Sequence, residues 1–155
     1  MRILAIDPGT SESAYVIYED GENLRVFGKI KNEDLYQKVM LPSISCFDVL
    51  AIEMIASYGM PVGREVFETC LWIGKFMQKC EDLEKKVMLV YRRDVKLFLC
   101  GSPKAKDGNI RQAIIDRIGE PGTKKCPGAT YGVSKDVWAA LAVALFAAST
   151  IYKER

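Results

Sequence analysis

The 155-residue chain contains no histidine. This absence excludes every site that depends on imidazole, including Ser-His-Asp and Cys-His relays, HExxH zinc sites and histidine-ligated haem. An enzyme of this composition has to use carboxylates, lysines, thiols or metal-activated water. Carboxylates are the abundant option, because the chain has 20 Asp and Glu beside 22 Lys and Arg.

Paired cysteines are also missing. The five cysteines include no CxxC pair and leave an odd one over, which argues against both a zinc ribbon and a disulfide framework. We therefore expect reduced thiols that mostly fill the core. The cysteines are Cys46, Cys70, Cys80, Cys100 and Cys126.

Long hydrophobic runs are absent as well. The longest, from Val137 to Ala148, falls short of the ~20 apolar residues that a membrane-spanning helix needs. The first residues lack the basic and apolar segments of a secretory leader, since Asp7 interrupts the early hydrophobic stretch. With 49% hydrophobic residues, we expect one domain over residues 1–155, cytoplasmic and without a membrane partner.

Hydrophobic periodicity predicts the element order β-β-β-α-β-α-β-α, with additional helical segments before the last helix. This order indicates an α/β protein with a mixed five-stranded sheet, in which three antiparallel strands are followed by two parallel ones and helices cover both faces. The predicted strands are 2–7, 15–18, 25–30, 48–53 and 87–91. The predicted helices are 32–39, 64–79, 93–99, one from Asp107 or Asn109 to Ile118, and a last one that is capped by Ser134 and runs to about Tyr152.

Two acids stand where apolar strands end. Asp7 closes the first strand and Glu53 the fourth, while Asp136 falls in the first turn of the last predicted helix. A carboxylate placed against a core without a partner costs several kcal/mol, and a divalent cation would offset that cost. Each acid alone has an ordinary explanation, as a polar strand terminus or as a helix-dipole residue. Their combination favours a metal site.

The residues around these acids resemble a known family. Ile6-Asp7-Pro8-Gly9-Thr10, Ala51-Ile52-Glu53, and Asp136 followed by Ala140-Leu141-Ala142-Val143-Ala144 look like the motifs of RuvC-type Holliday-junction resolvases, which belong to the RNase H-like superfamily. The resemblance covers nearly the whole chain, and the size and residues 106–115 look like the smaller, phage-type members.

The resemblance implies a metal-dependent endonuclease that hydrolyses phosphodiester bonds in four-way or other branched DNA. Asp7 would bridge two Mg²⁺ ions, with Glu53 holding one and Asp136 the other. Mn²⁺ could substitute, because oxygen ligands suit both ions, and no organic cofactor is implied. Family resolvases act as two-fold dimers, so a homodimer in a bacterial or phage-infected host cell is expected.

One position departs from the family pattern. The family usually places a second acid three residues after the first on the last helix, and this chain has Ala139 there. Asp107, at a predicted helix start, is the most attractive substitute, in at most an auxiliary role. Glu65 and Glu68 could also reach the site, although each of these acids has a simpler reading as a surface or capping residue.

The charge is unevenly distributed. The formal net charge is +2, yet residues 92–125 hold nine Lys or Arg against four acids, so this segment carries +5 and the remainder −3. Such a segment fits a phosphate-binding face, although charged helices are often simply solvated. The candidate nucleic-acid ligands there are Lys104, Lys106, Arg111, Lys124 and Lys125.

Tyr58 is a further candidate, in a Gly/Pro-containing connection after Glu53. It could stack on a base or pack beneath the loop.

Three readings compete with the resolvase. Another RNase H-like nuclease could act on a different DNA or on RNA. The missing acid at Ala139 would also suit a catalytically weak protein that only binds branched DNA. An actin-like nucleotide-binding domain shares the Asp-x-Gly-Thr turn, but the chain has no room for its second lobe.

Overall fold

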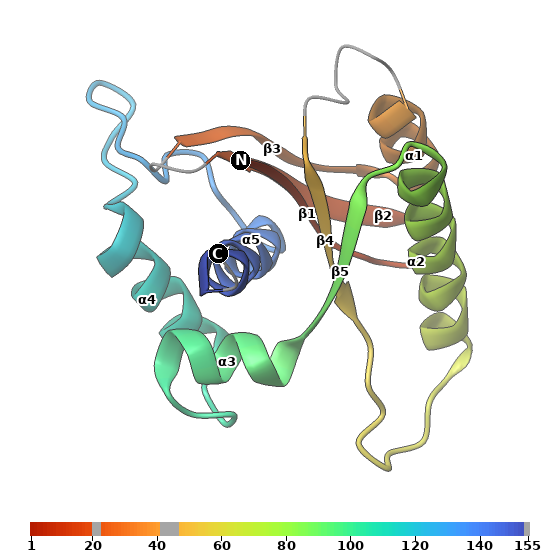
Figure 1. Ribbon diagram of the computed structural model, residues 1–155. Helices are drawn as coiled ribbons and strands as arrows, with labels where there is room; N and C mark the ends of the chain where they lie inside the picture. Colours follow the sequence, from red (N-terminus) through yellow and green to blue (C-terminus); the bar gives the residue numbers. More distant parts are fainter. Residues whose placement is uncertain (20–22, 41–46, 154–155) are drawn as a thin grey trace.

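A computed structural model describes residues 1–19, 23–40 and 47–153. The strands form one sheet in the order β3-β2-β1-β4-β5 (Figure 1). Antiparallel pairing joins β1 to β2 and β2 to β3, whereas β1 and β5 both pair in parallel with β4. This confirms the predicted mixed sheet. The strands are β1 (Arg2–Asp7), β2 (Glu12–Glu19), β3 (Asn23–Lys31), β4 (Val49–Met54) and β5 (Lys86–Tyr91).

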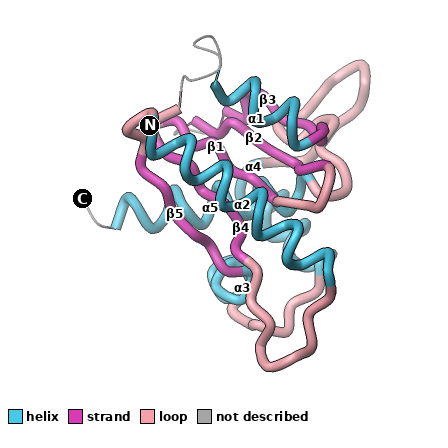
Figure 2. The backbone as a smooth tube through the Cα atoms, turned by 90° about the vertical axis from the view of Figure 1, so that its right-hand side faces the viewer, coloured by secondary structure: helices cyan, strands magenta, loops and turns pink. Residues whose placement is uncertain are grey.

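Helices cover both faces of the sheet (Figures 1 and 2). The first two lie on one face and the other three on the opposite face, each side with its own apolar cluster. Of the cysteines, Cys70, Cys80, Cys100 and Cys126 are free thiols, and Cys46 lies outside the described residues. The helices are α1 (Asn32–Met40), α2 (Arg64–Asp82), α3 (Arg92–Cys100), α4 (Asp107–Ile118) and α5 (Val137–Lys153).

Side chains of β1 alternate between the two faces. Ile3 and Ala5 belong to the cluster under α5, whereas Leu4 and Ile6 belong to the cluster under α1 and α2. The same period of two runs along β4. When this alternation is extended by one residue beyond Ile6 and Ile52, the side chains of Asp7 and Glu53 fall on the face of the sheet that α5 covers.

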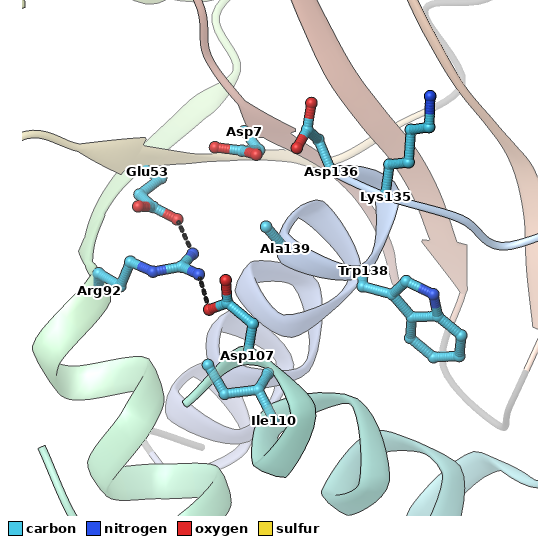
Figure 3. Close-up of a pocket in the computed structure, with 9 residues that line it drawn as sticks. All are labelled: Asp7, Glu53, Arg92, Asp107, Ile110, Lys135, Asp136, Trp138 and Ala139. Carbon is cyan, nitrogen blue, oxygen red and sulfur yellow. Dashed lines mark hydrogen bonds and ion pairs between the residues drawn. The ribbon is translucent and has the colours of Figure 1, made fainter. Parts of the chain in front are cut away.

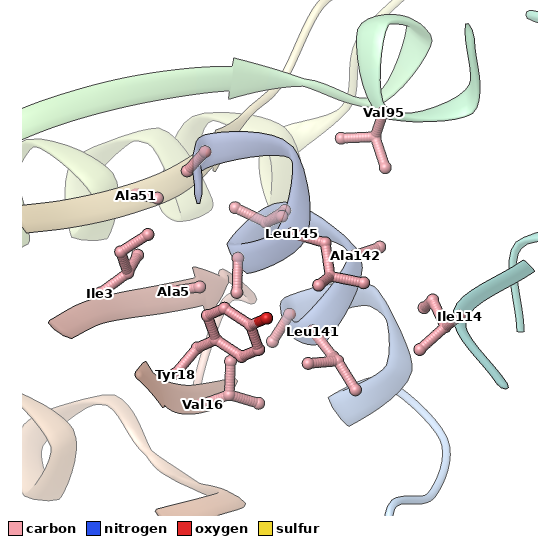
Figure 4. Close-up of a cluster of buried hydrophobic side chains, with 14 of the residues drawn as sticks. Ile3, Ala5, Val16, Tyr18, Ala51, Val95, Ile114, Leu141, Ala142 and Leu145 are labelled. Atoms are coloured by element: carbon pink, nitrogen blue, oxygen red, sulfur yellow. The ribbon is translucent and has the colours of Figure 1, made fainter. Parts of the chain in front are cut away.

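The α5 helix lies close against the middle of the sheet, because small side chains meet on both sides of the contact (Figure 4). Ala5 and Ala51 on the sheet and Ala140 and Ala144 on the helix are all fully buried. Most of α5 is buried on every side. Its apolar character therefore serves the core, and no helix among the described residues is long and apolar enough to cross a membrane.

A buried polar network fixes the turn that follows β1. The Asn32 side-chain amide donates to the Gly9 carbonyl oxygen at 2.9 Å, and the Ser13 hydroxyl donates to Asn32 Oδ1 at 2.6 Å. The Gly9 N–H in turn donates to Ser13 Oγ at 3.2 Å. A Cβ at Gly9 would collide with the Glu12 carbonyl oxygen, so the tight turn requires glycine. The network holds the backbone two residues after Asp7.

Candidate active site

Four acids from four parts of the chain line one pocket of about 320 Å³ (Figure 3). They are Asp7, Glu53, Asp107 and Asp136. The other lining residues are Arg92, Ile110, Lys135, Trp138 and Ala139.

The central strands position the first two acids. Asp7 ends β1 and Glu53 lies near the end of β4, one residue beyond the parallel pair Ile6 and Ile52. Both strands run in the same direction, so their ends meet at one edge of the sheet. Because the preceding residues alternate between the faces, both carboxylates lie on the side where α5 begins.

Asp136 joins them from the start of α5. The helix begins at Val137, two residues later than a Ser134 cap predicts, and the Asp136 carbonyl oxygen accepts the first helical hydrogen bond from the Ala140 N–H at 3.1 Å. Asp136 thus occupies the N-cap position instead of the first turn. Its carboxylate accepts a 2.6 Å hydrogen bond from Lys29 Nζ on β3.

Arg92 connects the remaining two acids. It follows β5 directly, and its guanidinium donates to Asp107 Oδ1 at 2.6 Å and to Glu53 Oε2 at 3.4 Å (Figure 3). The two acids differ in environment, since the Glu53 side chain is 16% exposed and that of Asp107 82%. Arg92 therefore balances part of the charge of the buried acid and links the start of α3 to the start of α4.

Burial and mutual repulsion disfavour the charged forms of the acids. Burial, followed by repulsion from Glu53 and Asp136, raises the pKa of Asp7 to about 7, although Arg92 and Lys29 partly oppose this. Burial also raises the pKa of Glu53, and Arg92 counteracts that rise. No hydrogen bond or ion pair joins Asp7 to another described side chain. The pocket thus has a carboxyl group that lacks a direct cationic partner.

This donor chemistry fits a hard divalent cation, which prefers carboxylate oxygens. Among the described residues, however, no three His, Cys, Asp or Glu side chains are grouped closely enough to hold one ion as they stand. Glu53 is bonded to Arg92 and Asp136 to Lys29, so two of these acids already have a basic partner.

Ala139, the position at which the resemblance to RuvC-type resolvases predicts a second acid, lies on the wall of this pocket. Asp107, the substitute favoured by the sequence, reaches the same pocket from the start of α4. Glu65 and Glu68 lie on α2 and do not line it, and Glu68 is paired with Arg64.

The predicted nucleic-acid ligands lie outside this pocket and are exposed. Lys104 and Lys106 lie in the connection before α4, and the Arg111 guanidinium lies 5.0 Å from the centre of the Trp138 ring, which lines the pocket. Lys124 and Lys125 form the tip of a small hairpin that is closed by reciprocal backbone hydrogen bonds between Thr123 and Cys126.

Tyr58 is 62% exposed, so packing beneath the loop does not explain it. It lines a different pocket, which also includes Arg92.

Sequence reasoning missed the basic side chains among the acids. The sequence patterns include Arg92 only in the net charge of residues 92–125, and they assign Lys29 and Lys135 no role beside the acids. A signal did exist for Lys29. In the antiparallel register it lies opposite Ala14, which lies opposite Asp7, so the hairpin places it two strands from the first acid.

Comparisons with known proteins complete the description of the site. No protein-family model matches the sequence, and no curated protein matches it significantly. The structure of Thermus thermophilus RuvC, in contrast, matches 99% of this chain and 97% of that chain, with a TM-score of 0.76 at 16% identity. The chain has the RuvC fold.

Two further solved structures share the RuvC fold with this chain. T. thermophilus RuvC in complex with a Holliday junction substrate has a TM-score of 0.72 at 17% identity, over 96% of this chain and 93% of that chain. The fowlpox virus resolvase in complex with substrate Holliday junction DNA has a TM-score of 0.59 at 14% identity, over 96% and 99%. The RuvC fold, an RNase H-like fold, accounts for the sheet order and for the helices on both faces.

Proposed function

We propose that the protein is a metal-dependent endonuclease that resolves Holliday junctions or other branched DNA. The observation that carries this proposal is the pocket, in which Asp7, Glu53 and Asp136 converge from β1, β4 and the start of α5 in a RuvC fold. The structures with the same fold include two complexes with junction DNA. Such an enzyme would act in recombination, repair or phage DNA processing, in the cytoplasm of a bacterial or infected cell.

Asp7, Glu53 and Asp136 would hold Mg²⁺ or Mn²⁺, with Asp107 as an auxiliary ligand. A divalent cation there supplies Lewis-acid activation for phosphodiester hydrolysis. In the two-ion version that the family resemblance implies, Asp7 serves both ions. The chain's own contribution is to present Asp7 deprotonated, which requires a proton to leave a carboxyl whose pKa is about 7.

The basic surface would bind the DNA backbone. Lys104, Lys106 and Arg111 lie on or before α4, whose first residue, Asp107, lines the pocket. Lys124 and Lys125 lie on a hairpin whose backbone is fixed by its own hydrogen bonds, so the backbone loses little conformational freedom when their side chains meet a phosphate.

A homodimer would place two pockets on a two-fold symmetric junction. The outer side of α2 supports this arrangement, because Phe67 and Leu71 lie one helical turn apart there and are 61% and 68% exposed. Large apolar side chains that repeat on one exposed helix face suit an isologous contact.

The test is nicking of a four-way DNA junction in Mg²⁺ or Mn²⁺ by the wild-type protein and by Asp7→Asn. The proposal expects cleavage that requires the metal and is lost in the variant. Equal cleavage of a linear duplex would indicate an RNase H-like nuclease with another substrate, and a parallel assay with RNA extends that comparison.

The second candidate function is a catalytically weak protein that binds branched DNA. Three observations favour it: Ala139 supplies no acid, Glu53 and Asp136 are each paired with a basic residue, and no three acids are grouped for an ion among the described residues. Tight junction binding without metal-dependent nicking would select this candidate.

A further inference from the structure

The acidic pocket, defined by its four lining acids, is also lined by two basic residues, Arg92 and Lys135. Four acids against two basic residues give the lining a formal charge of −2, and Lys29, which is bonded to Asp136, reduces it to −1. One divalent cation and one DNA phosphate then bring the total to zero, whereas two divalent cations and the same phosphate leave +2. The charge of the site therefore matches one ion.

Two positions account for the charge of the missing second ion. Ala139 lies on the wall of the pocket, where an acid would add one negative charge, and Lys29 supplies one positive charge beside it. With an acid at 139 and a neutral residue at 29, the site would be two charges more negative, which is the charge of one divalent cation. The donor set points the same way, since the described part of the chain has no three acids grouped around one ion.

Lys29 reaches the acidic pocket from β3. In the antiparallel register it lies opposite Ala14, which lies opposite Asp7, and its Nζ donates to Asp136 Oδ2 at 2.6 Å. Asp7 lies between Glu53 and Asp136 (Figure 3). The acid that binds Lys29 is therefore on the opposite side of Asp7 from Glu53.

The basic partners on these two sides are held differently. Arg92 donates to Asp107 at 2.6 Å but to Glu53 only at 3.4 Å, so it can yield Glu53 to a cation and keep its bond to Asp107. Lys29 makes a short bond to Asp136, and both side chains are partly exposed. An ammonium has three N–H donors, so Lys29 can donate to a DNA phosphate that covers the pocket while it stays bonded to Asp136.

We propose, on the basis of the proposed function, that the site holds one divalent cation between Asp7 and Glu53, and that the Lys29 ammonium takes the place of a second cation. Asp136 holds Lys29 where it donates to a non-bridging oxygen of the phosphate that is hydrolysed. A cation fixed there before the reaction stabilises the negative charge that the phosphate gains in the transition state.

Lys29 supplies charge and keeps its own proton. In the hydrolysis, the oxygen of water bonds to phosphorus, and the bond from phosphorus to one bridging oxygen breaks. Water loses one proton and the departing oxygen gains one, so the balance closes without Lys29. An arginine at this position should therefore serve in part, whereas a neutral side chain should not.

Counting ions tests the proposal without measuring cleavage. Two Mn²⁺ ions about 4 Å apart couple magnetically, and their electron paramagnetic resonance spectrum differs from that of isolated ions. Wild type should give only the isolated-ion spectrum, both alone and with a four-way DNA junction that it has already nicked. The double variant Lys29→Met, Ala139→Asp makes the site two charges more negative and should give the coupled spectrum under the same conditions.

The matched control for the spectra is the double variant Lys31→Met, Ala139→Asp, which should keep the isolated-ion spectrum. Lys31 ends the same strand but forms no ion pair with a described acid. Circular dichroism establishes that each variant is folded.

Single-turnover cleavage in saturating Mn²⁺ tests the role of the ammonium. Lys29→Met should cleave the bound junction about 10²–10³-fold more slowly, the loss typical of removing one donor to a transition-state oxyanion. Its dissociation constant for the junction should change by less than about tenfold, because Lys29 is one of many basic residues that can contact phosphate. Lys29→Arg should cleave within about tenfold of wild type, and Lys31→Met should cleave like wild type.

A coupled spectrum in wild type, or unchanged cleavage by Lys29→Met, overturns the inference. So does an isolated-ion spectrum in the folded Lys29→Met, Ala139→Asp variant. These outcomes leave the proposed nuclease intact, provided that wild type nicks the junction. Absence of metal-dependent nicking by wild type defeats the proposed function itself.

Discussion

Asp7 is the residue at which burial and charge repulsion combine most strongly. Its neighbours Glu53 and Asp136 each have a basic partner, in Arg92 and Lys29, but Asp7 has none bonded to it among the described side chains. The pocket therefore retains a preference for additional positive charge even though basic residues already occupy it. Two consequences can be measured at single positions.

The first consequence concerns how the free energy of unfolding depends on pH when EDTA removes metal ions. Folding raises the pKa of Asp7 from 3.8 to about 7, so between these two pH values the native state binds more protons than the unfolded state. The free energy of unfolding therefore falls as the pH rises from 3.8 to about 7. Asp7→Asn should remove the penalty and stabilise the protein at pH 8 by at most about 4 kcal/mol. Urea unfolding from pH 4 to 8 measures this.

The gain from Asp7→Asn should shrink toward zero at pH 4, where the carboxyl is protonated in the native state. Asp34→Asn, which changes an acid in the first turn of α1, serves as the control. A gain that stays constant over the whole range would contradict the assigned pKa.

The second consequence concerns Arg92, whose guanidinium competes with any divalent cation for Glu53. Arg92→Gln should bind Mn²⁺ about three- to tenfold more tightly in low salt, measured by calorimetry without DNA. Arg93→Gln is a matched control, because Arg93 adjoins Arg92 but forms no ion pair with a described acid. Equal or weaker Mn²⁺ binding by Arg92→Gln would rule out competition.

At the scale of elements, the position of Asp7 depends on contacts between β2, α1 and the turn after β1. Asn32, the first residue of α1, is fully buried, and its side chain bridges Ser13 on β2 and Gly9 in the turn. A helix start thereby fixes a strand end on the neighbouring part of the sheet.

Asn32→Ala should lower the free energy of unfolding by about 1–3 kcal/mol, because the Ser13 hydroxyl loses its acceptor and the Gly9 carbonyl oxygen loses its side-chain donor. It should also reduce junction cleavage at temperatures where the variant remains folded, since the turn after Asp7 loses its support. Urea unfolding and nicking assays measure the two effects. Gln37→Ala, an exposed polar change in the same helix, should affect neither.

The strand-borne part of the site was predictable from the sequence, and the contribution of the connections was not. A period of two and a shared strand direction are enough to bring Asp7 and Glu53 together at one edge. The bond between Arg92 and Glu53 was not predictable, because it depends on the path of the chain after β5, which brings the Arg92 side chain to Glu53. The last helix starts two residues later than a Ser134 cap predicts, since helix starts depend on local backbone geometry that periodicity does not record.

At the scale of the molecule, the exposed apolar side of α2 bears on assembly. Phe67→Glu should convert a dimer to a monomer in analytical ultracentrifugation, because a charge would be buried in the contact. Val26→Glu alters another exposed apolar residue, on β3, and should leave the oligomeric state unchanged. A wild-type protein that sediments as a monomer at high concentration would refute the proposed dimer.

The uneven charge of the molecule bears on DNA affinity. If the basic segment makes about five phosphate contacts, log K should fall with log salt at a slope near −4 to −5. Replacing Lys124 and Lys125 by alanine should reduce the steepness by up to about 2, since both lie at an exposed hairpin tip. Fluorescence anisotropy across a salt series measures both slopes, and a flat wild-type slope would contradict the proposed surface.

The burial of α5 also bears on local unfolding near the acidic pocket. Asp136 is joined to a helix whose residues are buried almost throughout, against the same strands that carry Asp7 and Glu53. Amide protons in such a helix exchange with solvent only when the whole domain opens, in contrast to those of frayed ends and exposed loops. The middle of α5 is therefore expected to hold the slowest-exchanging amides of the domain, and the backbone that carries Asp136 is attached directly to that part of the fold.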